Sequence, residues 1–70
     1  MPIALAPLHE EVTVVRIGCD PKDLSHLAAL GLSKGAVVTV ISSVLGSVVV
    51  LVKGTRLALD HQIAAKIFVA

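Results

Sequence analysis

Three histidines, one cysteine and one aspartate are the side chains of this chain that could ligate a transition metal. They are His9, Cys19, His26, Asp60 and His61. A preformed site needs donors that converge at about 2.0 to 2.3 Å from one ion. Two ligands three or four residues apart on a helix are the usual sequence sign of such convergence, and no two of these five have that spacing. The sequence therefore predicts no preformed metal site.

We expect each histidine to lie on the surface or at a helix end instead. His26 falls on the polar face of the first expected helix, and His9 lies in the N-terminal arm. His61 follows Asp60 at the start of the last expected helix, where an aspartate is a favoured N-cap. The three histidines and Asp60 are therefore expected to be exposed to solvent or to stabilise a helix end.

The chain also lacks a nucleophile with an activating partner. Ser42 and Ser43 have no neighbouring histidine, Cys19 has no base in sequence reach, and no carboxylate pair offers general acid and base chemistry. Gly31 and Gly35 follow a helix rather than a strand, unlike the glycines of a phosphate-binding loop. A chain of 70 residues leaves little room for a desolvated cleft. We expect no enzymatic activity, no catalytic residue and no bound cofactor.

Composition and charge limit the partners. The six lysines and arginines are scattered through the chain, the net charge is +1, and Phe68 is the one aromatic residue. Binding of RNA or DNA needs clustered basic residues and, for single strands, stacking aromatics. No apolar stretch approaches the ~20 residues of a membrane helix, and the N-terminus lacks the basic region of a signal peptide. We therefore expect neither nucleic-acid binding nor membrane insertion.

The length and the single cysteine point to one small cytoplasmic domain. A 70-residue chain buries only about 60% of its unfolded surface, so residues 1–70 form a single domain that needs a dense core or a partner. Cys19 cannot form an internal disulfide, and a lone free cysteine fits a reducing compartment. Hydrophobic residues make up 56% of the chain, and valine dominates among them. This composition favours a β-rich body.

The helices and strands that we expect follow from the hydrophobic periodicity and from the residues that begin or end such elements. Residues 12–17 have strand composition, and Asp20, Pro21 and Asp23 mark a helix start that leads to Gly31. Leu30 and Leu32 bracket that glycine, and we expect both to enter the core. Strands follow over 36–43, 48–53 and 55–58, a short helix ends near residue 66, and 67–69 form a last strand. Five strands with a helix between the first two describe a mainly β, small SH3-like barrel.

The run Leu-Gly-Leu-Ser-Lys-Gly-Ala-Val-Val-Thr-Val-Ile, residues 30–41, joins the helix to the second strand. Gly31 is placed to end the helix with positive φ, and Gly35 to turn the chain. This run resembles the Leu-Gly-Leu-x-Pro-Gly-x-x-Val-x-Val signature of the FeoA family, although Lys34 replaces the usual proline and Glu10 or Glu11 a common glycine. The C-terminal block from Gly54 also resembles the family. The residues that match are Leu30, Gly31, Leu32, Gly35, Val38, Val40, Gly54, Ala58, Leu59, Ala64, Ile67 and Val69.

The resemblance implies an SH3-like fold and a role as an accessory protein of ferrous iron uptake. It implies docking on the cytosolic part of the FeoB-type membrane permease. The alternative is a free-standing regulatory module, because similar SH3-like domains form the C-terminal part of metal-dependent repressors. A third alternative is a small RNA- or DNA-binding barrel, which the charge pattern disfavours.

The surface offers one candidate for partner binding. If Thr13, Val15 and Ile17 face the core, alternation along the strand places Val12 and Val14 on the outside. The same alternation places Val49 and Leu51 outside on a later strand. A monomer rarely leaves such an apolar patch in water. Two explanations are open for Val12, Val14, Val49 and Leu51. They contact a partner or a second copy of the chain, or the first helix and the terminal strand cover most of them.

Overall fold

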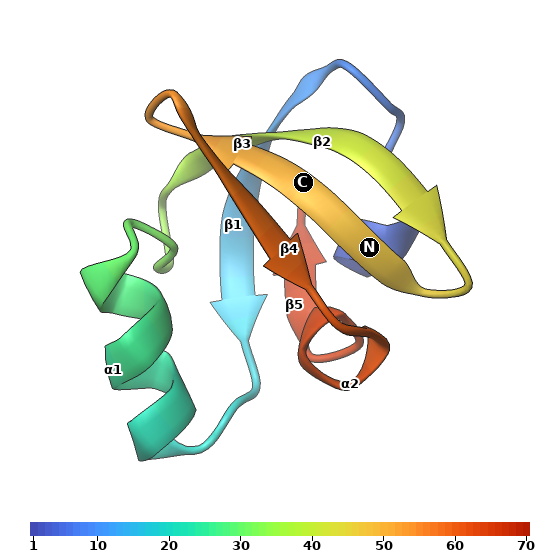
Figure 1. Cartoon of the computed structure of the whole chain (residues 1–70). Helices are drawn as coiled ribbons and strands as arrows, with labels where there is room; N and C mark the ends of the chain where they lie inside the picture. The colour runs from blue at the N-terminus through green and yellow to red at the C-terminus, as the bar shows by residue number, and fades with distance from the viewer.

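The computed structural model describes residues 1–70, which form one sheet and three short helical segments (Figure 1). In chain order these elements are the 3-10 helix η1 (Ile3–Leu5), β1 (Glu11–Ile17), α1 (Pro21–Ala29), β2 (Val37–Val44), β3 (Ser47–Val52), β4 (Thr55–Leu59), α2 (His61–Ala64) and β5 (Ile67–Val69). The predicted order of strands and helices is confirmed, and η1 is an addition to it. No helix is long and apolar enough to cross a bilayer.

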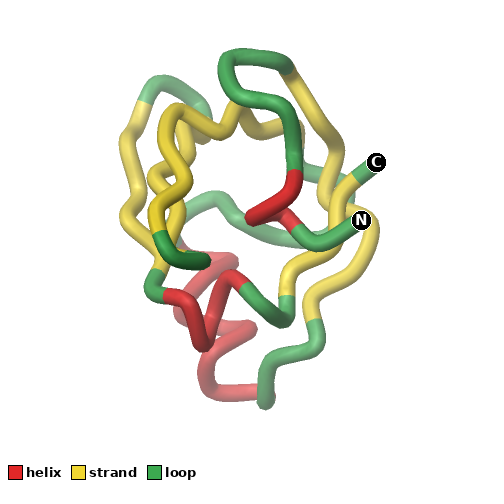
Figure 2. The backbone as a smooth tube through the Cα atoms, turned by 90° about the vertical axis from the view of Figure 1, so that its right-hand side faces the viewer, coloured by secondary structure: helices red, strands yellow, loops and turns green.

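All strand pairs are antiparallel, and the strand order is β4-β3-β2-β1-β5. The sheet curls around its interior like a barrel, but β4 and β5 are not paired with each other. Figure 2 shows the strands surrounding the η1 turn, with the two termini side by side. The sheet therefore has two edges, at β4 and at β5.

The core is built from alternate valines on the concave face of the sheet. Val38 and Val40 on β2, and Val48, Val50 and Val52 on β3, are at most 1% exposed. Because successive side chains of a strand point to opposite faces, these residues share one side of the sheet. Val37 and Val44, the other valines of β2, are 52% and 66% exposed and lie outside the core.

The orientation predicted for β1 is wrong. Val12 and Val14 are 7% and 1% exposed, whereas Val15 is 41% exposed. Val12 pairs with the core residue Val38, and Val14 pairs with Val69, so both point inward. A β-bulge between Val14 and Arg16 then shifts the alternation. The β-branched residues of this strand occupy both faces, so alternation in the sequence could not decide between them.

The N-terminal residues are part of the fold rather than a free arm. Ile3 is fully buried and belongs to the core. The amino group of Met1 donates a hydrogen bond to the carbonyl of Val69 over 2.8 Å, and the Val69 N–H donates to the Met1 carbonyl over the same distance. Pro2 forms a bridge with Phe68. The outer edge of β5 is therefore covered by the first residues of the chain.

Both predicted helix caps are present. The side chain of Asp20 accepts a hydrogen bond from the Asp23 N–H, and that of Asp60 accepts one from the Ile63 N–H, each over 2.9 Å. Pro21 occupies the first turn of α1, as predicted. These bonds satisfy N–H groups that have no partner within the helix.

Gly31 ends α1 with φ of 92°, which confirms the positive φ predicted for it. Its N–H donates to the Ala28 carbonyl, and the N–H of Leu32 donates to the Leu27 carbonyl. This is the Schellman arrangement, in which the residue after the glycine packs against the last turn of the helix. Leu32 and Leu27 are accordingly buried, but Leu30 is 42% exposed. The prediction that Leu30 enters the core is wrong because Leu30 precedes the reversal of the chain.

We expect Gly31→Val to lower the free energy of unfolding by about 1–3 kcal/mol, because a β-branched residue is strained at positive φ. A Cβ there would also lie 3.4 Å from Cγ1 of Val52. Gly18→Ala is the control, since Gly18 lacks positive φ and its Cβ would meet only ordinary contacts at 3.6 Å or more. Chemical denaturation measures both. An unchanged midpoint for Gly31→Val would contradict this account of the helix end.

Ile3→Ala should destabilise the protein by about 2–5 kcal/mol, the usual cost of truncating a fully buried isoleucine. Leu5→Ala, in the same helical turn, should change stability by less than about 0.5 kcal/mol because Leu5 is 72% exposed. Thermal or urea unfolding of the two variants provides the comparison. Equal effects would show that η1 does not seal the core.

Candidate functional site

The candidate metal ligands do not converge. His9, His26 and His61 are exposed, and Asp60 accepts the capping hydrogen bond of α2. No group of three or more His, Cys, Asp or Glu side chains is arranged to hold a metal ion.

Cys19 lies in the core and is 9% exposed. Burial raises the pKa of its thiol above the usual value, and the carboxylates of Asp23 and Asp20 raise it further against the opposing charge of Lys66. A raised pKa keeps the sulfur protonated at neutral pH, and the thiol is a much weaker nucleophile than the thiolate. The position fits a packing role for this cysteine.

Two grooves meet at the end of β4. The first, which we call the helix groove, lies between α1 and β4 and encloses about 230 Å³. Figure 1 shows α1 standing beside the sheet on the side toward which β4 presents its free edge. The groove has a largely apolar lining with two carboxylates. Its residues are Asp23, His26 and Leu27 of α1, the C-cap residue Leu30, Leu57, Ala58 and Leu59 of β4, and Asp60 and Ile63.

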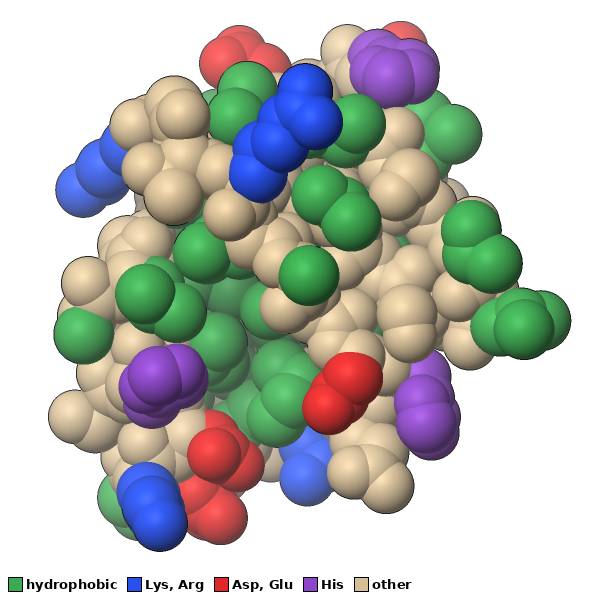
Figure 3. All heavy atoms as spheres, in the orientation of Figure 1, with side chains coloured by type: hydrophobic (Ala, Val, Ile, Leu, Met, Phe, Trp, Pro, Cys, Tyr) green, Lys and Arg blue, Asp and Glu red, His purple; other side chains and the backbone are tan.

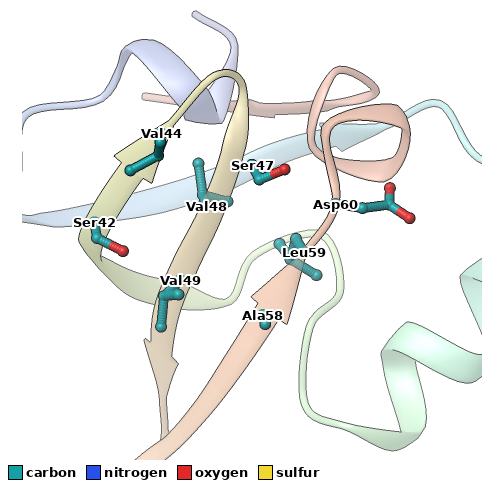
Figure 4. A pocket seen from close by; sticks show the side chains of 8 residues that line it. All are labelled: Ser42, Val44, Ser47, Val48, Val49, Ala58, Leu59 and Asp60. Atoms are coloured by element: carbon teal, nitrogen blue, oxygen red, sulfur yellow. The ribbon is translucent and has the colours of Figure 1, made fainter.

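The second, which we call the sheet groove, extends from β4 across β3 to β2 and encloses about 480 Å³ (Figure 4). Ser42, Val49 and Ala58 form a row across it, because Ser42 pairs with Val49 and Val49 pairs with Ala58. These are small side chains, so the sheet is hollowed along this row. The other lining residues are Val44, Ser47, Val48, Leu59 and Asp60.

A third groove of about 410 Å³ separates α1 from β1. Val15 and Ile17 of β1 line it opposite Leu24 and Ala28 of α1, with Arg16 and Lys34 also present. Leu27 is the single buried residue of α1. The helix is therefore attached along a narrow line and leaves an apolar groove on each side.

The space-filling view shows hydrophobic side chains in a hollow on one face, with acidic and histidine side chains beside it (Figure 3). Asp23, His26 and Asp60 are the titratable residues of the helix groove. Neither the helix groove nor the sheet groove is lined by lysine or arginine. Both grooves thus combine an apolar lining with negative charge.

The predicted partner surface is only partly available. Val12 and Val14 are buried and cannot meet a partner, which corrects the expectation for β1. Val49 is half-buried in the sheet groove, and Leu51 is 36% exposed. Leu57 and the other β4 residues lie outside the partner surface predicted from the sequence. The signal available was the alternation of Arg-Leu-Ala-Leu in a short strand.

The residues that resemble the family signature lie mostly in the core or at turns. Gly31, Gly35 and Gly54 have positive φ, which explains glycine at those positions. Leu30 and Ala58 differ, since both are exposed and both line the helix groove. The buried ones are Leu32, Val38, Val40, Leu59, Ala64, Ile67 and Val69.

An open, curled sheet of five antiparallel strands, with a helix after β1 and a helical turn before β5, defines a small SH3-like domain. The model of the FeoA domain matches residues 1–70. The chain therefore belongs to the FeoA family, and this membership implies a role in ferrous iron transport.

Three solved structures share the fold. An iron uptake regulatory protein (FeoA) has a TM-score of 0.86 and 24% identity, over 99% of this chain and 93% of that chain. FeoA from Chlorobium tepidum has a TM-score of 0.85 and 22% identity, over 99% and 68% of the two chains. T. acidophilum IdeR has a TM-score of 0.84 and 30% identity, over all of this chain and 33% of that chain. A comparison with curated proteins found no match.

We expect the purified protein to bind neither ferrous iron nor zinc at one ion per chain, because no set of donors converges. Anaerobic equilibrium dialysis followed by elemental analysis measures this. Binding of one ion per chain that is lost in His26→Ala, His61→Ala or Cys19→Ser would show that donors meet across two copies of the chain.

Proposed function

We propose that this protein is a non-enzymatic cytoplasmic accessory protein of ferrous iron uptake that docks on the cytosolic part of a FeoB-type permease. The match of the FeoA domain model to residues 1–70 carries this proposal. The surface supports it, because the grooves beside β4 and α1 are apolar clefts of the kind that take a partner segment. A docking protein needs such a surface and needs no reactive group.

A regulatory module is the second candidate. It is favoured by the 30% identity to T. acidophilum IdeR, of which this chain corresponds to about a third. In this role the grooves would bind another part of a regulator rather than a permease. The two candidates share one physical activity, the binding of a polypeptide, and differ in the partner.

Nucleic-acid binding is not proposed. The net charge is +1, and the guanidinium of Arg16 lies 5.5 Å from the centroid of the Phe68 ring. One face of the only aromatic ring in the chain is thus covered by a cation. Binding of single strands usually relies on several aromatic side chains on which successive bases stack.

Deletion of the gene should lower the initial rate of ferrous iron uptake in the host, and expression of the wild-type chain from a plasmid should restore it. Uptake of radioactive ferrous iron under reducing conditions provides the measurement. The tagged protein should also retain the purified cytosolic domain of the permease. Ferric iron uptake serves as the control, because a defect specific to the permease leaves it unchanged.

Two results would contradict the proposal. One is ferrous uptake that does not depend on the gene. The other is a protein that fails to bind the permease domain yet binds a transcriptional regulator from the same host, which would favour the regulatory module.

A further inference from the structure

β4 is an edge strand with an uncovered side. It pairs with β3 alone, whereas the other edge strand, β5, is flanked by β1 and by Met1 and Pro2. An uncovered edge presents unpaired N–H and C=O groups, which can template another strand. The two edges of this sheet are therefore not equivalent.

The β3–β4 turn identifies which backbone groups are free. Lys53 and Gly54 have φ of 50° and 80°, as in a two-residue type I′ hairpin, and Val52 pairs with Thr55 across them. The flanking pair of such a turn is hydrogen-bonded, and hydrogen-bonded pairs alternate along an antiparallel ladder. It follows that Leu57 and Leu59 also bond to β3. The remaining β4 residues, Arg56 and Ala58, direct their N–H and C=O groups away from the sheet.

The helix groove and the sheet groove meet at this free edge. Ala58, Leu59 and Asp60 line both of them. A strand added beside β4 would direct its side chains alternately to the two faces of the sheet. A side chain opposite Ala58 would extend the row that runs through Val49 to Ser42. The edge thus offers hydrogen bonds together with a recess for side chains on either side.

We propose that β4 accepts an extended segment of a partner polypeptide as an added strand, held by the backbone of Arg56 and Ala58. The segment alternates apolar residues with at least one lysine or arginine. This inference rests on the proposed function for the identity of the partner and on the structure for the mode of binding. Strand addition of this kind takes its affinity from main-chain bonds and its specificity from side-chain pockets.

The negative charge of the helix groove is the reason to expect a lysine or arginine in the bound segment. Asp23 and Asp60 line the helix groove, and no lysine or arginine does. The Asp23 carboxylate accepts none of the hydrogen bonds that side chains make in this protein, and Asp60 uses one oxygen for its cap. Both carboxylates therefore retain acceptors for an ammonium or guanidinium group.

The dimensions favour a single extended strand over a helix or a second barrel. An added strand lies about 4.7–4.9 Å from its neighbour, whereas a helix with its side chains is about 10–12 Å wide. The helix groove encloses about 230 Å³, which is room for a few side chains of a strand that pairs with β4 but not for a whole helix. A second copy that paired through its own β4 would carry β3 directly behind that strand. Because α1 stands beside the edge of β4, this second sheet would meet the helix.

Hydrogen exchange provides the direct test. The probe is the acetylated and amidated peptide Val-Lys-Val-Lys-Val-Thr-Val, with the same peptide carrying glutamate in place of lysine as control. In the free protein the amides of Arg56 and Ala58 should exchange rapidly, while those of Leu57 and Leu59 are protected. The lysine peptide should protect Arg56 and Ala58, and the glutamate peptide should bind about tenfold more weakly or not at all.

Ala58→Pro isolates the main-chain contribution. Proline removes the outward N–H of Ala58 and leaves the ladder to β3 intact, as proline does on natural edge strands. It should weaken peptide binding about tenfold, whereas Ala58→Ser, which keeps both the N–H and a small side chain, should bind like the wild type. Wild-type binding by a folded Ala58→Pro protein would overturn the proposal.

A charge variant tests the same site without altering the backbone, in case Ala58→Pro fails to fold. Asp23→Lys should weaken binding of the lysine peptide, and Glu10→Lys, an exposed residue outside all three grooves, makes the same charge change as a control. Equal effects of the two variants would overturn the inference. The inference would also be overturned if the peptide protected only amides that line the groove between α1 and β1. A dimer whose formation depends on β4 would overturn it as well.

The permease domain separates this inference from the proposed function. If the domain binds while the Arg56 and Ala58 amides stay unprotected, strand addition is wrong and the proposed function stands. If the lysine peptide protects these amides while the permease domain does not bind, strand addition stands and the proposed partner is wrong.

Discussion

A core built largely of valine must be sealed from water with very few residues. Seven valines are less than 2% exposed, no polar side chain is buried, and the chain has no disulfide. Stability therefore depends on hydrophobic burial, which contributes in proportion to the apolar area removed from water. The curled sheet encloses most of this core. Ile3 from η1 and Leu27 and Leu32 at the end of α1 add the large side chains from outside the sheet, and Ala6, Cys19 and Ala64 add small ones.

The sheet that encloses this core is open, and one of its two edges is covered while the other is not. Met1 and Pro2 cover β5. Arg56 and Ala58 on β4 have β3 on one side and no strand on the other. A bare edge is a hazard for aggregation unless it is short or charged, and β4 has five residues with Arg56 among the exposed ones. A short edge of this kind is also suited to binding one partner segment.

The attachment of α1 connects the core to the surface. The helix contributes only Leu27 to the core, and its last turn is fixed through the bonds of Gly31 and Leu32 to the helix carbonyls. Leu24 and Ala28 of the helix, and Leu30 at its C-cap, line grooves instead of entering the core. The same geometry that closes the core with one leucine therefore creates the recesses on either side of the helix.

The sequence by itself determined the local features of this protein. Caps at Asp20 and Asp60, the helix end at Gly31, the turns and the FeoA family follow from short runs of residues, because capping and positive φ are set by neighbouring backbone atoms. The tertiary structure alone decided the rest. The inward face of Val12 depends on its pairing with Val38 of β2, and the free edge at Ala58 depends on which strand lacks a neighbour. Strand pairing joins residues far apart in the chain, so a pattern of alternating β-branched residues leaves it open.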